Sequence, residues 1–144
     1  MLDSETIIFN FQVINFQISS NFQMTNFQTK NYKNPLDDRT LKFGKKIIQL
    51  CKKLPKNIAT TELIKQIMRS GCSVGANYRE ANDALSKKDF LHRMRICRKE
   101  AKETLYWLQL TLKACPEHER DIEPLMKESQ EMVKILSSII EKSK

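Results

Sequence analysis

Apolar residues that recur at alternating intervals of four and three are the feature that most constrains this chain. The first run passes from Leu36 through Phe43, Ile47 and Leu50 to Leu54, and three similar runs follow it. This spacing keeps side chains on one face of an α-helix, which has 3.6 residues per turn. With 3 Gly and 4 Pro among 144 residues, the chain also lacks the turn residues of an all-β fold. The sequence therefore predicts four amphipathic helices.

Capping residues and prolines predict where these helices begin and end. The first is expected over residues 38–54, with Pro55 directly after it. The second begins near residues 57–61, the third follows the N-cap Ser86 and ends at Pro116, and the fourth begins around Pro124. Because the connections are short, neighbouring helices should be antiparallel. We expect an all-α fold, an antiparallel up-down four-helix bundle.

The first 33 residues differ from the rest of the chain. An Asn-Phe-Gln unit occurs there four times, beginning at Asn10, Asn15, Asn21 and Asn26. Successive units begin five, six and five residues apart, and this spacing matches neither a helix face nor a strand face. We therefore divide the chain into a low-complexity tail over residues 1–33, expected to be disordered, and a bundle domain over residues 34–144. Met24 is an internal start candidate, which raises the hypothesis that part of this tail is not translated.

Two features of the helices predict close contacts. The apolar stripes of the first and fourth helices are wider than one small bundle core needs, which favours a contact between subunits. In the second helix, Gly71 and Gly75 lie one turn apart. Glycine inside a helix costs about 1 kcal/mol relative to alanine, so this pair indicates tight packing or a special site.

The chain carries no signal for a membrane or for secretion. It has no run of about 18 apolar residues, and Asp3 and Glu5 stand where a signal peptide would be basic. Its four cysteines are spaced by 21, 25 and 18 residues, without a Cys-x-x-Cys or Cys–His pair. Three of them fall on apolar helix faces. We expect buried, reduced cysteines in a cytoplasmic protein, with no metal site.

Positive charge is concentrated in the first three helices. Residues 38–102 contain 17 Lys and Arg against 6 Asp and Glu, whereas residues 117–144 contain 5 against 7. A cationic face of this kind neutralises phosphates, so RNA or DNA is the expected partner, although a solvated lysine-rich face is the alternative. The candidate nucleic-acid-binding residues are Lys42, Lys45, Lys46, Lys52, Lys53, Arg93, Arg95, Arg98, Lys99 and Lys102.

No constellation of residues in the sequence supports catalysis. A di-iron bundle needs paired Glu-x-x-His motifs, and the nearest approach is a single Asp89-x-x-His92. Neither His92 nor His118 has a nucleophile partner at a defensible spacing, and no Gly-rich phosphate loop is present. We therefore expect a non-enzymatic protein without catalytic residues or a cofactor.

One stretch resembles a known bacterial family. It reads Arg69-Ser70-x-x-Ser73-Val74-x-x-Asn77 with Glu80 beyond it, and similar segments follow at 86–90, 96–104 and 107–108. These motifs resemble the four-helix bundle proteins of 23S ribosomal RNA intervening sequences, which are related to the accessory protein of diversity-generating retroelements. The resemblance spans residues 36–141 and excludes the tail. The commoner form of the family reads Asn-Ile-Ala-Glu-Gly, and in this chain its later part is replaced by Tyr-Arg-Glu-Ala over residues 78–81.

The resemblance implies an antiparallel four-helix bundle that assembles into a basic homopentameric ring. For the retroelement relatives it implies binding to nucleic acid and to a reverse transcriptase. The intervening-sequence members have no established biochemical activity.

The motif also has a physical interpretation. Ser70, Ser73, Asn77 and Glu80 share one helix face, and the glutamates of the third helix could face either Arg69 or Arg79. A hydrogen-bonded polar layer that fixes register or subunit pairing is favoured over a ligand site. The set is Arg69, Ser70, Ser73, Asn77, Arg79, Glu80, Glu100 and Glu103.

Two functions remain open from the sequence. The first is a homo-oligomer that binds the RNA or DNA backbone as an accessory factor. The alternative is a structural or protein-binding oligomer, for example a partner of a reverse transcriptase, whose lysines serve only solubility.

Overall fold

A computed structural model describes residues 34–144, and the tail lies outside the described residues. Its elements are α2 (Pro35–Lys53), α3 (Ile58–Asn82), α4 (Lys87–Ala114), the 3₁₀-helix η1 (Pro116–His118) and α5 (Glu119–Lys142). Over these residues there is no strand. The prediction of an all-α protein with four amphipathic helices is confirmed.

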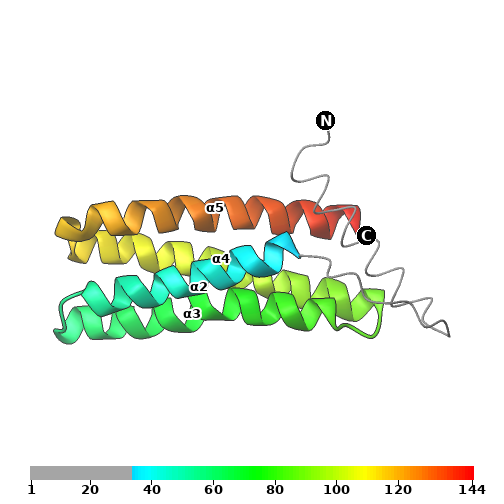
Figure 1. Ribbon diagram of the computed structural model, residues 1–144, viewed down its shortest axis with the longest axis horizontal. Coiled ribbons are helices and arrows are strands. Elements are labelled where there is room, and N and C mark those ends of the chain that lie inside the picture. The colour runs from blue at the N-terminus through cyan, green and yellow to red at the C-terminus, as the bar shows by residue number, and fades with distance from the viewer. Residues whose placement is uncertain (1–33) are drawn as a thin grey trace.

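The four helices lie side by side along one long axis, and the chain reverses direction at each connection (Figure 1). α3 packs against α2 and α4, and α5 packs against α4. We call the contact between two packed helices a seam. The fourth seam, between α2 and α5, is the least extensive of the four. α2 and α4 therefore occupy opposite corners of the bundle, and their outward faces point away from each other.

Caps and prolines explain most helix ends. The side chains of Asn34, Asn57 and Ser86 each accept a hydrogen bond from the backbone three residues on, which caps α2, α3 and α4. The prediction for the fourth helix was wrong, because α5 begins at Glu119, five residues before Pro124. A proline that early removes only one backbone hydrogen bond, and the helical turn before it buries Ile122 completely.

The predicted stripes form the core. On α2, Leu36, Phe43, Ile47 and Leu50 are at most 2% exposed. The wide stripe of α5 also packs onto the bundle, since Met126 and Val133 are partly buried against the core. The second row of α2 is different, because Leu41 and Ile48 remain 42% and 41% exposed. Only α2 thus presents the surplus apolar surface that the sequence predicted for both helices.

The two glycines of α3 sit where α2 crosses it. A Cβ at Gly71 would lie 2.9 Å from Cγ1 of Ile47, and one at Gly75 would lie 3.2 Å from Oγ1 of Thr40. Both distances are shorter than an ordinary van der Waals contact. The predicted tight packing is therefore present, and it holds α2 against α3. Gly44 of α2 differs, because a Cβ there would meet nothing within 4 Å.

These glycines give a matched pair of substitutions. Gly71→Ala should lower the free energy of unfolding by about 1 kcal/mol, because overpacking against Ile47 outweighs the gain in helix propensity. Gly44→Ala should raise it by about 1 kcal/mol, because only the propensity changes. Urea denaturation followed by circular dichroism measures both. Equal stability of the two variants would mean that α2 does not approach α3 this closely.

Candidate interaction surfaces

The outward face of α4 carries an uninterrupted cationic ridge. Arg95, Lys99 and Lys102 follow one another at intervals of four and three, and all three are exposed. Among residues 34–144, none of them has a carboxylate within 4 Å. Tyr106, one turn further on, is 54% exposed. We call Arg95, Lys99, Lys102 and Tyr106 the α4 ridge.

Two other candidate cations already have carboxylate partners. Lys53 donates to Oδ1 of Asp121 at 2.7 Å. Arg93 pairs with Glu80 on α3 and lies 3.6 Å from Oδ1 of Asp89. These ion pairs reduce the charge that Lys53 and Arg93 can offer to a phosphate.

The remaining candidates do not form one surface with the α4 ridge. Arg98 flanks that ridge and donates to Oγ of Ser137 on α5 at 3.4 Å. Lys42, Lys45 and Lys52 are exposed on α2, at the opposite corner of the bundle, and Lys46 lies on the α5 side of α2. Within one subunit, the cations expected to act together are thus separated into two surfaces.

The serines and the asparagine of the family motif bond to their own helix. Ser70, Ser73 and Asn77 donate to the backbone carbonyls of Gln66, Arg69 and Ser73, at 2.8, 2.5 and 2.9 Å. Ser70 is fully buried. These three hydrogen bonds therefore satisfy the side chains within α3 and do not link it to another helix.

The charged motif residues do link helices. Arg69 contacts both Glu100 and Glu103 on α4, and Glu103 also accepts from the indole nitrogen of Trp107 at 3.2 Å. Of the two arginines considered, Arg69 is thus the one that faces these glutamates.

Arg79 instead reaches back to the start of α2. It forms a bidentate pair with Asp37, with nitrogen–oxygen distances of 2.6 and 3.0 Å. Hydrogen bonding to Asp37 raises the pKa of the Arg79 guanidinium above its ordinary value. Glu80 pairs with Arg93. These pairs connect α3 with α2 and with α4 at the surface of the bundle.

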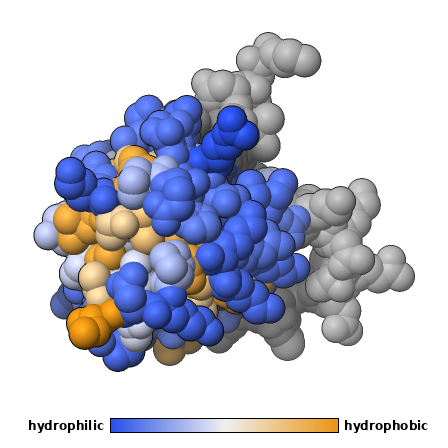
Figure 2. Space-filling view, turned by 90° about the vertical axis from the view of Figure 1, so that its left-hand side faces the viewer, coloured by the Kyte–Doolittle hydropathy of each residue, from blue (hydrophilic) through white to orange (hydrophobic). Residues whose placement is uncertain are grey.

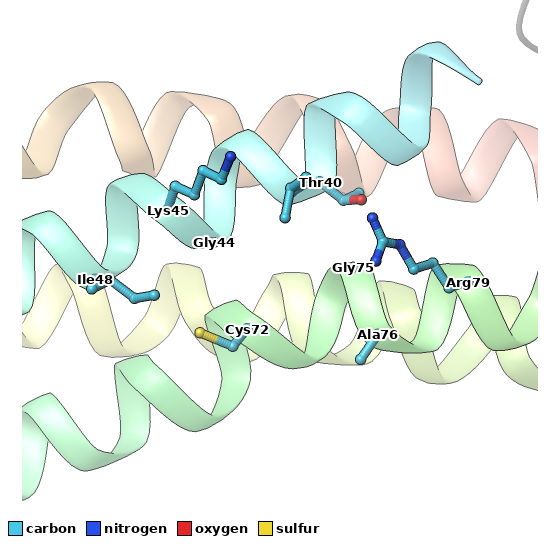
Figure 3. A pocket seen from close by; sticks show the side chains of 9 residues that line it. Thr40, Gly44, Lys45, Ile48, Cys72, Gly75, Ala76 and Arg79 are labelled. Atoms are coloured by element: carbon cyan, nitrogen blue, oxygen red, sulfur yellow. The ribbon is translucent and has the colours of Figure 1, made fainter. Parts of the chain in front are cut away.

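A groove of about 280 Å³ runs between α2 and α3. Figure 3 shows Ile48 of α2 and Cys72 of α3 pointing into the space between the two helices, with Gly44 and Ala76 beside them. Leu41 completes its apolar lining. Because Gly44 has no side chain, the centre of the groove is hollow. We call this the α2–α3 groove.

Sequence reasoning expected surplus apolar surface on α2 but did not place this groove. The spacing of Leu41, Gly44 and Ile48 places these residues on one face of α2. They line a groove only because α3 lies beside that face.

Apolar surface is also present at one end of the bundle. Figure 2 looks onto the end that holds the α2–α3 connection, and hydrophobic surface gathers on one side of it while hydrophilic side chains cover the other. Ile58, the first residue of α3, is 93% exposed.

The cysteines divide as the sequence predicted. Cys51, Cys97 and Cys115 are buried, Cys72 is exposed, and all four are free thiols. Burial raises the pKa of Cys97 to about 12 and that of Cys51 to about 11. The described residues contain no group of three His, Cys, Asp or Glu placed to hold a metal ion. No helix among them is long and apolar enough to span a membrane.

Comparison with known proteins agrees with this fold. Residues 36–138 match the family described as 23S rRNA-intervening sequence protein. A crystal structure of a Bacteroides thetaiotaomicron protein of unknown function, from the S23 ribosomal protein family, is 38% identical, with a TM-score of 0.66. The match covers 73% of this chain and 97% of that one. No curated protein matches the sequence.

The architecture is thus that of a basic four-helix bundle protein. The chain belongs to the 23S rRNA-intervening sequence protein family.

The exposure of the four cysteines generates a prediction. At low protein concentration and pH 8, Cys72 should react with a disulfide reagent at least ten times faster than the other three thiols, because burial limits both their access and their thiolate fraction. The release of thiolate from the reagent measures the rate. Cys72→Ser should remove the fast phase, and a fast phase that persists in this variant would contradict the assignment.

Proposed function

We propose that this protein is a non-enzymatic, cytoplasmic accessory factor that binds the RNA or DNA backbone as a homo-oligomer. The proposed subunit is an antiparallel up-down bundle, and a homopentameric ring is the assembly that the family resemblance implies. A reverse transcriptase is the kind of protein partner that this resemblance adds.

The observation that carries the proposal is the α4 ridge. Its three cations are spaced along about 10 Å of helix, at 1.5 Å per residue, and have no carboxylate within 4 Å among the described residues. Cations that form no close ion pair can neutralise phosphates and release counterions, which gives binding without sequence preference. Tyr106 adds an exposed ring on which an unpaired base can stack.

Removing the ridge should weaken binding in a salt-dependent way. In the full chain, the triple substitution Arg95→Ala, Lys99→Ala and Lys102→Ala should lower the affinity for structured RNA and duplex DNA. The slope of log binding constant against log salt concentration should also become less negative by about 2 to 3, because each phosphate contact contributes about 0.7 to 0.9 to this slope. Fluorescence anisotropy across a salt series measures both quantities.

The matched control removes three cations that already have carboxylate partners. Lys65, Lys134 and Lys144 each pair with a glutamate three residues away. Their triple alanine variant has the same net charge as the ridge variant and should retain the wild-type slope. Equal losses in the two variants would mean that net charge alone, and not the α4 ridge, governs binding.

The α2–α3 groove favours the second function, a protein-interaction oligomer without direct nucleic-acid binding. Leu41 and Ile48 are large apolar side chains that stay more than two-fifths exposed beside a hollow at Gly44. Surfaces of this kind are typical of contacts between proteins. Retention of a specific protein at high salt, together with absence of RNA and DNA binding at low salt, would favour this function over the first.

Both functions require assembly, and the groove offers a test of it. Ile48→Asp should lower the oligomer mass measured by light scattering, because it places a charge on the apolar surface. Leu85→Asp makes the same chemical change at a residue that is 99% exposed, so it should leave the mass unchanged. In the wild type, Cys72 should react more slowly with the disulfide reagent as the protein concentration rises, because assembly would cover the groove that Cys72 lines. A normal mass for Ile48→Asp would exclude the groove as the subunit contact.

A further inference from the structure

A second groove, between α2 and the first turns of α5, combines cations with an apolar floor. It has a volume of about 210 Å³. Lys46 and Lys53 line it from α2, and Arg120 lines it from α5. Leu50 and Leu125, which are 2% and 3% exposed, also line it. We call this the α2–α5 groove.

The charges that line this groove do not cancel. Asp121 is the one carboxylate in its lining, and it accepts a hydrogen bond from Lys53 at 2.7 Å. That bond, with the charges of Lys53 and His118, lowers the pKa of Asp121, which is therefore ionised at neutral pH. Lys46 and Arg120 have no carboxylate within 4 Å among residues 34–144. The lining thus carries three cations against one anion.

A further cation lies on α2 just beyond the lining of the groove. Lys42 precedes Lys46 by one helical turn, so the two side chains share a face. Gln49 lies between Lys46 and Lys53 and contributes an amide to the lining. A chain of phosphates that enters the groove would therefore meet further donors beyond it.

We propose that the α2–α5 groove binds phosphate groups, with Arg120 and Lys46 as their principal partners. A guanidinium offers parallel donors that match two phosphate oxygens, and an ammonium adds a compact charge. The inference rests on the proposed function where the phosphate belongs to a nucleic acid, but free pyrophosphate presents the same chemistry.

The test titrates the full chain with pyrophosphate by calorimetry and, separately, with single-stranded RNA across a salt series. Arg120→Ala and Lys46→Ala should each weaken pyrophosphate binding about tenfold, since each removes a charge-assisted hydrogen bond. Lys127→Ala removes an exposed cation of α5 outside the groove and should change the affinity less than twofold.

A variant that binds more tightly distinguishes a binding site from a defect in folding, because misfolding would only weaken binding. Asp121→Asn removes the one carboxylate of the groove and should strengthen pyrophosphate binding several-fold. Glu131→Gln makes the same change of charge on α5, outside the groove, and should have little effect.

The outcomes keep the two proposals distinct. Equal effects of Arg120→Ala and Lys127→Ala on pyrophosphate would overturn the phosphate groove, while the α4 ridge variants would still decide nucleic-acid binding. Arg120-dependent binding of pyrophosphate by a protein that binds no RNA or DNA would support the groove and overturn the proposed function. Arg120-dependent binding of both ligands would support both proposals.

Discussion

The close approach of α2 to α3 determines the position of everything that α2 contributes. Without a side chain, Gly71 lets Ile47 reach the backbone of α3, and Gly75 does the same for Thr40. The seam between α2 and α3 is consequently much more extensive than the seam between α2 and α5. One contact thus produces both grooves, because it turns the second apolar row of α2 towards α3 and leaves space on the α5 side. A residue larger than glycine at position 71 would change both surfaces together.

The sequence contained enough information for the helices and most of their ends. Spacing identified the buried face of each helix, because 3.6 residues per turn place those side chains together whatever the partner is. The start of α5 was missed because a proline is common in the first turn of a helix, and here it lies in the second turn. The burial of Ile122 supports the extra turn, and burial depends on neighbours that the local sequence does not name.

The candidate surfaces were less accessible to sequence reasoning. Helical spacing placed Arg95 and Lys102 on one face, but it could not tell that Lys53 would pair with Asp121 across the bundle. It also could not tell that α2 and α4 occupy opposite corners. Arg120 was missed because it stands among acidic residues in the chain, and only folding brings it beside Lys46. Net charge along a segment is thus a poor guide to the charge around a groove that two segments share.

The arrangement of seams has a consequence for how the chain folds. Most helix contacts join neighbours in sequence, and the least extensive of the four main seams is the one that closes the bundle between α2 and α5. The helices that form these contacts are joined by short connections, so little loop-closure entropy is lost before their packing begins. We therefore expect α3 and α4, which share the most extensive seam, to pair first, with α2 packing onto α3 and α5 onto α4 afterwards.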